Sequence, residues 1–282
     1  MGRAATAVLL ALALCTTTVC ARAGDSTSEP PLSGSTIDYD YDGRDIGHPE
    51  RAWQGRAYVP PAARKASDPV PLVVFLHGLN KALIEHRWMG GGTEGDVRRI
   101  IGTMVERGAV EPVVVAGPGS IVASQVSHGA SWDFFDLDNF LDRTIEALRG
   151  VARIDEARIV VAGHSGAGCS SAGGLATVGQ SRRPLRAILS IDTCMGGWLA
   201  EALARSKPST HVVVSYQTRS WRSRSFAVFR KLFEREVARH PPAAGVLREL
   251  DEQKPAGAYH DATVALTFQR WLPKVLAGRG AR

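Results

Sequence analysis

Short apolar runs of strand length recur along this chain, separated by longer amphipathic stretches. The runs are rich in β-branched residues, and several are continuously apolar, which is typical of strands buried on both faces of a parallel sheet. The pattern therefore predicts one α/β domain with a mostly parallel central sheet and helices on both faces. The expected strands are residues 52–59, 71–76, 112–116, 157–162, 185–191, 211–216 and 245–251.

The stretches between these runs predict the helices. Thr93, with Asp96 three residues later, resembles a capping box, so a helix is expected to begin there and to end near Arg107. Small and apolar residues after Ser165 predict another helix, and Pro273 is expected to end the last one. The remaining helices are expected at residues 137–148, 198–204, 225–239 and 262–272.

The first 23 residues have the pattern of a secretory signal peptide. Arg3 supplies the positive charge, Ala7–Cys15 the apolar stretch, and Ala21-Arg22-Ala23 the small residues of a cleavage site. Cleavage there makes Gly24 the first residue of a secreted or periplasmic protein. No later segment has eighteen uninterrupted apolar residues, so integral membrane association is not expected.

Export also changes how the four cysteines are interpreted. Cys15 and Cys20 lie within the signal peptide, and neither follows the small residue that lipoprotein anchoring requires. Cys169 and Cys194 remain. An even pair in an oxidising compartment predicts a disulfide, with two small buried thiols as the alternative.

The composition divides the rest of the chain into two parts. Residues 24–50 are rich in Gly, Ser, Pro and Asp, so a flexible N-terminal segment is expected there, and residues 51–282 are expected to form the folded domain. The 34 basic residues include Arg3 and Arg22, so the mature chain keeps 32 against 28 acidic ones, a net charge of about +4. This mild charge, without a dense basic tract, argues against nucleic-acid binding.

The stretch Ile159–Gly168 joins a buried strand directly to the sequence Gly-His-Ser-Gly. A nucleophile elbow has this context, because a sharp turn after a strand lifts a serine hydroxyl above the sheet. Small flanking residues are needed because the turn brings backbone segments close together. An ordinary glycine-rich turn with a capping serine is the alternative. The strand before the motif favours Ser165 as a nucleophile.

At this motif the chain resembles the α/β-hydrolase family, over about Arg51 to Gly278. A second matching block, Val73–Asn80, is a strand that runs into a His-Gly loop. Ala167 stands where the family motif has a glycine, which leaves the subfamily open. The resemblance implies an oxyanion hole formed by the backbone N–H groups of Leu79 and Gly166.

The resemblance also implies a general base late in the chain. Among the eight histidines, His260 lies between the last predicted strand and the final helix, so it is the implied base. The family usually places the orienting acid after the next-to-last strand, but Tyr216–Arg222 contains no carboxylate. Asp192, at the end of the preceding strand, is then the implied acid. A helix-capping role is its alternative, and Asp251 and Glu252 are the fallback acids.

In this fold the strands that lead to Ser165 and Asp192 are neighbours. The resemblance therefore implies that Cys169 and Cys194 can meet. Their disulfide would tie the turn after the nucleophile to the loop that holds the acid.

Loops after the strands face the active site in this fold, which implies candidate substrate-binding residues. Trp132 and Phe134 are candidates for lining the pocket, with packing under their loop as the alternative. Arg219 and Arg222 are candidates for contacting an anionic substrate, because arginine suits carboxylates and phosphates. A solvated basic loop is the alternative for them.

Together these patterns predict an exported serine hydrolase that cleaves carboxylic esters through a Ser-His-Asp triad and an acyl-enzyme. The substrate is expected to be a small molecule or a peptide. A serine peptidase or amidase that acts on cell-envelope peptides is one alternative, and a non-catalytic binding protein with the same fold is another. The sequence has no P-loop and no clustered Cys/His ligand set, so no cofactor or metal is expected.

Overall fold

The structure is a computed structural model, and it describes most of the chain beyond the first thirty residues. The predicted signal peptide lies outside the described residues, as do Phe134 and Arg222. Leu32–Arg282 forms one compact unit. The described residues are 31–41, 53–82, 84–119, 132–133, 135–219, 226–257 and 259–277.

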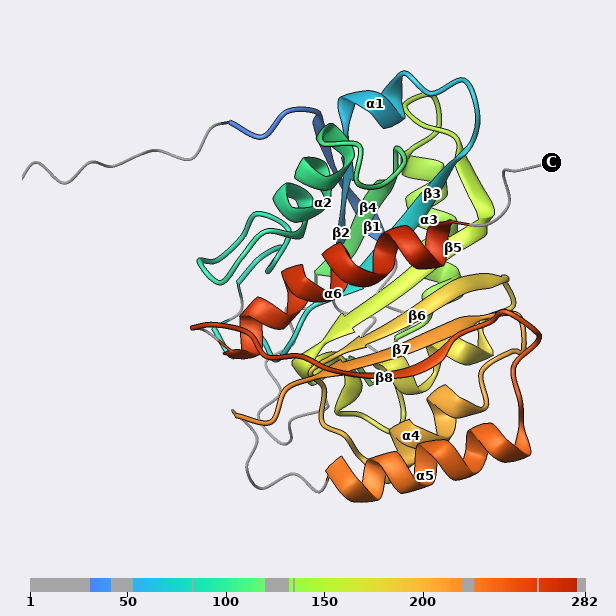
Figure 1. Ribbon diagram of the computed structural model, residues 1–282. Coiled ribbons are helices and arrows are strands. Elements are labelled where there is room, and N and C mark those ends of the chain that lie inside the picture. The colour runs from blue at the N-terminus through green and yellow to red at the C-terminus, as the bar shows by residue number, and fades with distance from the viewer. Residues whose placement is uncertain are drawn as a thin grey trace, which may run out of the picture. The chain divides into compact units, whose positions relative to one another are not determined.

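The described residues contain one eight-stranded sheet with the order β1-β2-β4-β3-β5-β6-β7-β8 (Figure 1). The pairs β1–β2 and β2–β4 are antiparallel, and every pair from β4 to β8 is parallel. The predicted mostly parallel sheet is thereby confirmed. The strands are β1 (Ser35–Tyr41), β2 (Trp53–Val59), β3 (Val70–Leu76), β4 (Val114–Gly119), β5 (Ile154–His164), β6 (Leu185–Ile191), β7 (His211–Tyr216) and β8 (Arg248–Glu252).

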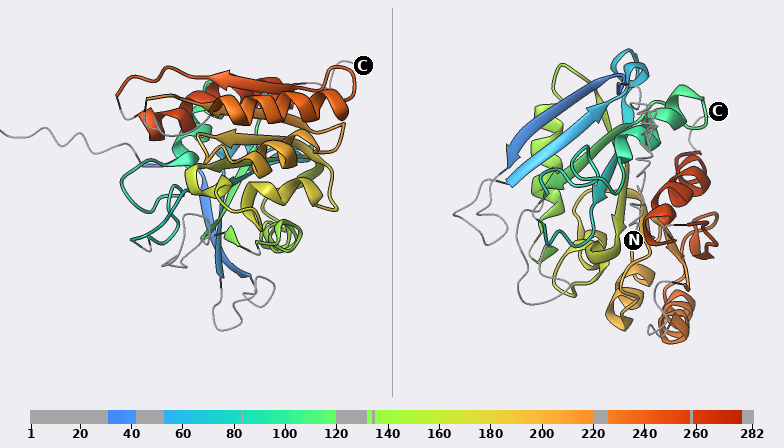
Figure 2. Two further views of the ribbon diagram at one scale, coloured as in Figure 1. Left: turned by 90° about the horizontal axis from the view of Figure 1, so that it is seen from below. Right: turned by 90° about the vertical axis from the view of Figure 1, so that its left-hand side faces the viewer.

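Helices cover both faces of the sheet, and Figure 2 shows α3 and α6 on opposite sides of it. Along β3, Val73 and Phe75 pack into the core under α2 and α6, whereas Leu72, Val74 and Leu76 pack into the other core. This alternation explains why the run is continuously apolar, since both sets of side chains are buried. One face carries α2 (Val97–Glu106) and α6 (Tyr259–Leu276), and the other carries α1 (Pro61–Arg64), α3 (Leu137–Ala147), α4 (Gly197–Ala204) and α5 (Phe226–Arg239).

The prediction of a flexible segment at residues 24–50 is wrong for Ser35–Tyr41, which forms the edge strand β1. Its side chains alternate between half-buried and exposed positions, as expected for an edge strand with one packed face. The phenol of Tyr39 hydrogen-bonds the hydroxyl of Thr144 in α3 at 2.6 Å. The exposed positions are polar or acidic, so the composition looks like that of a linker although the period is that of a strand.

Two helix boundaries also differ from the predictions. The cap of α2 is Asp96, whose carboxylate accepts from the N–H of Arg98 at 3.0 Å, so the helix begins three residues after the predicted capping residue, Thr93. The last helix does not end at Pro273 but continues to Leu276. Ala277 N donates to the carbonyl of Pro273 at 2.8 Å, so the final turn closes although proline itself has no N–H to donate.

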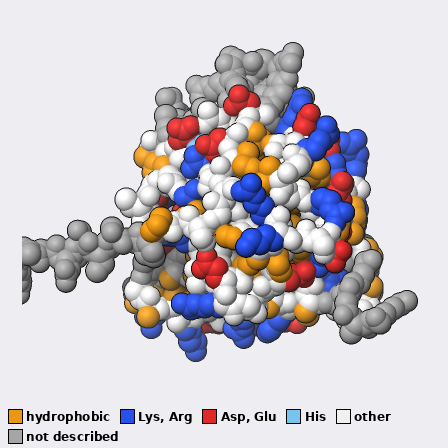
Figure 3. Space-filling model, turned by 90° about the horizontal axis from the view of Figure 1, so that it is seen from above, with side chains coloured by type: hydrophobic (Ala, Val, Ile, Leu, Met, Phe, Trp, Pro, Cys, Tyr) orange, Lys and Arg blue, Asp and Glu red, His pale blue; other side chains and the backbone are white. Residues whose placement is uncertain are grey.

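Basic and acidic side chains are interspersed over the face of the molecule shown in Figure 3. Several described charges form ion pairs: Arg183 pairs with both Asp142 and Glu156, and Arg158 lies 2.7 Å from a carboxylate oxygen of Glu111. Among the described residues, no helix combines the length and apolar character needed to cross a membrane.

Candidate active site

The chain turns sharply where β5 ends. Ser165 has φ = 53°, in the left-handed region that residues other than glycine rarely occupy. Residues are held in such conformations only where the surrounding structure imposes them, and these positions cluster at functional sites. The serine identified from the sequence therefore lies on a strained turn at the carboxyl end of a central parallel strand.

The α-helix predicted after Ser165 is wrong. A single 3-10 turn (Ser165–Gly168) follows, and two further short turns (Gly174–Ala176 and Val178–Gln180) carry the chain toward β6. Residues 166–179 include five glycines, and each costs a helix interior about 1 kcal/mol relative to alanine. A turn this short has no macrodipole like that of a longer helix. Stabilisation of negative charge near Ser165 therefore depends on individual N–H groups.

The loop after β3 lies directly against this turn. A Cβ on Gly78 would stand 2.9 Å from Cβ of Ser165, and a Cβ on Gly166 would stand 2.7 Å from the backbone nitrogen of Leu79. Only glycine permits such close approach at these positions. The two backbone segments predicted to form an oxyanion hole, at Leu79 and Gly166, are therefore neighbours in the structure.

Trp132 lies beneath this loop and does not offer its surface to a substrate. Its side chain is only 1% exposed, and its indole N–H donates to the carbonyl of His77 at 2.9 Å. The Nδ1–H of His77 in turn donates to the carbonyl of Gly78 at 2.6 Å. Burial lowers the pKa of His77 to about 4, which keeps the ring neutral at physiological pH. The alternative interpretation of Trp132, packing under a loop, is the one the structure favours.

Arg87 holds the other side of the same loop. Its guanidinium donates to the carbonyl of Leu79 and lies 2.6 Å from Oε1 of Glu94. The side-chain amide of Asn80 bonds both the N–H and the carbonyl of Ile84, at 2.9 and 2.8 Å. These contacts fix the backbone that follows the Leu79 N–H, and the bond from His77 to the Gly78 carbonyl fixes the backbone before it.

Asp192 and His260 meet although 68 residues separate them. Nδ1 of His260 lies 2.6 Å from Oδ2 of Asp192, whose side chain is 1% exposed. His260 lies in the first turn of α6 and not in the predicted loop, and 26% of its side chain remains exposed. The capping alternative for Asp192 is not what the structure shows, since Gly196 caps α4.

Gln217 is a residue of this site that sequence reasoning missed. Its side-chain amide donates to Oδ2 of Asp192 at 2.7 Å, and its backbone N–H points to Oδ1 at 3.4 Å. It directly follows β7, within Tyr216–Arg222, the segment that contains no carboxylate. The sequence did contain a signal for this role, because Gln217 offers an amide donor directly after the strand. A buried carboxylate on the neighbouring strand needs such hydrogen-bond donors.

The fallback acids do not contact His260. Asp251 accepts from the indole N–H of Trp271 at 2.7 Å and from Arg270 at 2.8 Å. Glu252 is exposed and lies 3.5 Å from the phenol oxygen of Tyr216.

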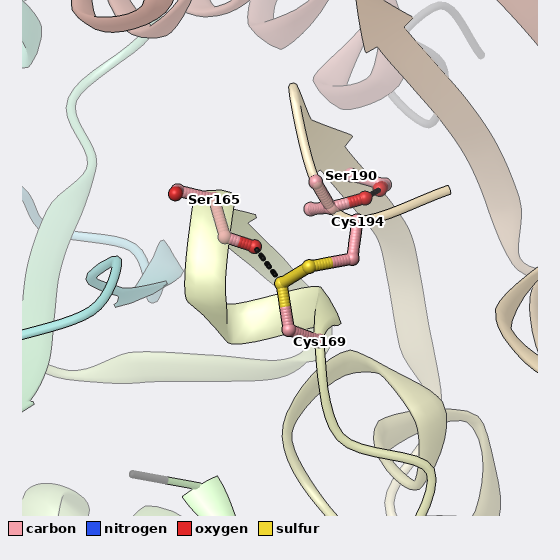
Figure 4. Close-up of a disulfide and its surroundings, with 5 residues drawn as sticks. Ser165, Cys169, Ser190 and Cys194 are labelled. Carbon is pink, nitrogen blue, oxygen red and sulfur yellow. Dashed lines mark hydrogen bonds between the residues drawn. A yellow bond between two sulfur atoms is a disulfide. The ribbon is translucent and has the colours of Figure 1, made fainter. Parts of the chain in front are cut away.

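The disulfide between Cys169 and Cys194 is present, with 5.0 Å between the two Cα atoms. It joins the turn after Ser165 to the loop after Asp192, as predicted. Figure 4 shows the Ser165 hydroxyl pointing away from the disulfide. Sγ of Cys169 lies 3.4 Å from the Ser165 carbonyl oxygen, which is a packing contact because a disulfide sulfur carries no hydrogen.

Arg219 lies close to the base. Its backbone N–H donates to the side-chain carbonyl of Gln217 at 2.8 Å, and its guanidinium donates to the phenol oxygen of Tyr259 at 2.8 Å. The same guanidinium lies 4.8 Å from the centre of the Tyr259 ring. Gln217 and Tyr259 thus connect Arg219 to both members of the Asp192–His260 pair.

His164, His260 and Asp261 are the described residues whose potential metal-ligand atoms come closest together, all within 4.8 Å. Nε2 of His164, which lies 4.0 Å from Asp261, donates to the carbonyl of His260 at 3.2 Å. A nitrogen that donates a proton has no lone pair for a metal. In this arrangement Nε2 of His164 is therefore not available as a metal ligand.

No protein-family model matches this sequence, and neither does any curated protein. Solved structures do match it in shape. A ferulic acid esterase shares 12% identity with a TM-score of 0.61, covering 87% of this chain and 98% of that one. A ferulic acid esterase from Anaeromyces mucronatus shares 13% identity with a TM-score of 0.59, covering 88% and 93%.

A third match is an S-formylglutathione hydrolase from Agrobacterium tumefaciens, at 14% identity and a TM-score of 0.55, covering 88% of this chain and 98% of that one. The chain has the α/β-hydrolase fold. The expected fold is thereby confirmed. At such identities the likeness extends to the fold alone, so the chemistry of this α/β-hydrolase-fold protein has to be argued from its own residues.

Proposed function

We propose that this protein hydrolyses carboxylic esters with Ser165 as nucleophile, His260 as general base and Asp192 as the acid that orients the base. The observation that carries the proposal is the 2.6 Å contact between Asp192 and His260, formed at the same sheet edge as the strained turn of Ser165. The names of the structural neighbours, which include esterases and hydrolases, support the same reaction class.

The tautomer of His260 supports its role. Asp192 is a carboxylate that accepts from Nδ1–H, so the neutral imidazole carries its lone pair on Nε2. That nitrogen takes the proton from the Ser165 hydroxyl as the oxygen attacks the acyl carbon, and then delivers the proton to the leaving alcohol. Asp192 fixes the ring and stabilises the transient imidazolium. Water then attacks the acyl-enzyme by the same route in reverse.

The N–H groups of Leu79 and Gly166 are the proposed donors to the tetrahedral oxyanion. Their backbone segments are in close contact, and the Leu79 peptide is held by Arg87 and Asn80 as described above. Preorganised donors of this kind are usually worth about 10²–10³ in rate each. These two N–H groups have to stabilise the oxyanion by themselves, because the short 3-10 turn after Ser165 supplies no helix macrodipole.

A fluorophosphonate probe and a paired ester and amide substrate test the proposal. Fluorophosphonate should label the wild type and the Ser170→Ala variant, whose altered serine lies five residues further on, but not Ser165→Ala. Ser165→Ala should lose ester turnover by about 10³-fold or more while unfolding at the same urea concentration. Faster hydrolysis of the amide than of the matched ester would favour the peptidase alternative. An unlabelled wild type would favour a binding protein.

We further propose that the substrate is a small molecule with an anionic group, which Arg219 contacts. Among the described residues, Arg219 has no carboxylate partner, and its polar contacts are those with Gln217 and Tyr259. A charge-assisted contact with substrate is worth about 1.5–3 kcal/mol. Arg219→Gln should therefore raise KM about tenfold or more for an ester with a free carboxylate and leave a neutral ester unchanged. Arg230→Gln, on α5, is the control, and equal effects on both substrates would contradict the proposal.

We also propose that the protein is exported. The Cys169–Cys194 disulfide supports an oxidising compartment, where such bonds persist. Expression in a secreting host should yield a product whose N-terminal residue is Gly24. Recovery of the full-length chain from the cytoplasm alone would contradict this.

A further inference from the structure

His164, the residue before Ser165, is buried at the centre of the site, and the proposed reaction does not use it. Its side chain is 2% exposed. Its ring centre lies 4.4 Å from that of His260 and 5.4 Å from that of Trp88. A histidine in this position contacts both the turn of the nucleophile and the ring of the base.

Hydrogen bonding determines the tautomer of His164. Nε2 lies 3.2 Å from the carbonyl oxygen of His260, and a carbonyl can only accept, so Nε2 carries the proton. Among the described residues, Nδ1 has no hydrogen-bond partner and is buried. A second proton on Nδ1 would therefore create a buried charge with no acceptor.

Burial and the neighbouring basic side chains keep the His164 imidazole neutral. Burial is the main cause that lowers its pKa well below the usual value, followed by the positive charge that His260 can carry. Arg87 and His77, from the loops on the other side, lower it further. Asp261 lies 4.0 Å from Nε2 of His164, and burial raises the pKa of its carboxyl group.

We propose that His164 is a positioning residue for His260. Its Nε2–H anchors the first turn of α6 to the end of β5, and its neutral ring packs against the imidazole that becomes charged during the reaction. A neutral aromatic ring beside a cation stabilises that cation. A second protonated histidine in the same place would oppose it. This inference rests on the proposed function, because it assigns His260 as the base.

Two substitutions separate the two parts of this role. His164→Gln keeps an amide N–H that can reach the His260 carbonyl but removes the ring. His164→Phe keeps a ring but removes the donor. The His260 carbonyl still accepts from the Thr263 hydroxyl at 2.5 Å, so neither change leaves it without a donor. His211→Gln is the matched control, since His211 is also buried but lies at the opposite end of the sheet, where β7 begins.

The experiment measures kcat and KM for a neutral ester between pH 5 and 9, per active site titrated with fluorophosphonate. His164→Phe should lower kcat roughly 10- to 100-fold with little change in KM, because a small misplacement of the base is enough for such a loss. His164→Gln should recover most of that loss. The acid limb of its kcat/KM profile should move to lower pH, because the imidazolium of His260 loses the packed ring.

The control and the outcomes distinguish this inference from the proposed function. His211→Gln should change neither kcat nor the acid limb.

Wild-type kinetics in both His164 variants would overturn the positioning role and leave the Ser165 assignment intact. A kcat loss without any shift of the acid limb in His164→Gln would overturn the ring-packing part. If His164→Phe does not fold, His164→Gln still decides the question. A wild-type enzyme that is neither labelled nor active overturns the proposed function itself.

Discussion

Two buried aspartates lie at the carboxyl ends of parallel strands, one after β6 and one in β8, and they have different partners. Asp192 and Asp251 each accept from a glutamine side chain, Gln217 and Gln253 respectively. Asp192 also bonds the imidazole of His260, which can gain and lose a proton near neutral pH. Asp251 instead accepts from the guanidinium of Arg270 and the indole N–H of Trp271, which both stay protonated at physiological pH.

Burial and strand-end position therefore do not by themselves distinguish Asp192, the proposed catalytic acid, from Asp251. What distinguishes them is a partner that can exchange a proton. Trp271 and Arg270 hold the middle of α6 against the sheet through Asp251, and His260 in the first turn of the same helix meets Asp192. One helix thus connects both aspartates, with different consequences.

Activity measurements provide the largest test of this contrast. Asp192→Asn should lower kcat by about 10³–10⁴-fold, because an amide can orient the His260 ring in the wrong tautomer and cannot stabilise the imidazolium. Asp251→Asn should stay within about threefold of the wild type per titrated active site. The reverse ranking would assign the acid to β8.

The disulfide joins the loop after Asp192 to the turn after Ser165 and does not involve β8. Its removal should therefore loosen the region around Asp192 more than the region around Asp251. Cys169→Ser with Cys194→Ser should lower the free energy of unfolding by about 3 kcal/mol, since the bond closes a loop of 25 residues. Amide exchange should become faster around residues 166–180 and stay unchanged in β8. The oxidised wild type should weigh two hydrogens less than its reduced form, and two free thiols in the exported protein would contradict the prediction.

Substitution of Asp251 should change the free energy of unfolding more than the activity. Asp251→Asn should lower the free energy of unfolding by about 1–3 kcal/mol, because buried donors lose part of a charged acceptor. Urea unfolding followed by tryptophan fluorescence measures the change. Arg270→Gln is a milder control, since that side chain is half exposed. No loss in Asp251→Asn would mean that α6 is held mainly by its apolar contacts.

Acid should weaken the protein at both ends of the sheet. Burial lowers the pKa of His77, beside the site, and of His211, at the start of β7, to about 4. Both imidazoles are neutral in the folded protein but take up protons on unfolding below about pH 6.5. The unfolded state therefore binds more protons, and the free energy of unfolding decreases as the pH is lowered from about 6.5 to 4. Each contributes up to about 1.4 kcal/mol per pH unit. Urea midpoints at pH 7, 6 and 5 should fall less steeply in His211→Gln; an unchanged slope would exclude it as a contributor.

The two glutamines offer the smallest and most closely matched test. Gln217→Met should lower kcat about three- to tenfold, because Asp192 loses a 2.7 Å donor next to its bond with His260. Gln253→Met should leave kcat unchanged and lower stability by about 1 kcal/mol, because it removes bonds to Asp251 and Thr267. Identical kinetic effects would erase the distinction between the two regions.

Local pattern was enough to predict most of the fold. Strand runs such as Leu185–Ile191 and His211–Tyr216 were placed at their observed bounds, because burial on both faces leaves a continuous apolar signature in the sequence. The resemblance to the α/β-hydrolase family then implied that Ser165 and Asp192 lie at one sheet edge and that Cys169 can meet Cys194. The strand Ser35–Tyr41 escaped prediction because its exposed residues resemble a linker.

The sequence left Asp251 and Glu252 open beside Asp192 as the acid, and only the tertiary structure decided which of them meets His260. The bond between His260 and Asp192, in preference to Asp251, depends on where α6 crosses the ends of β6 and β8. The contact of His164 with the His260 carbonyl depends on the same crossing, whereas Gln217 reaches Asp192 from the end of the neighbouring strand β7. Apolar periodicity encodes where an element lies and which face it buries. It carries no information about which distant side chain completes a hydrogen bond, because that choice is made by packing among elements far apart in the chain.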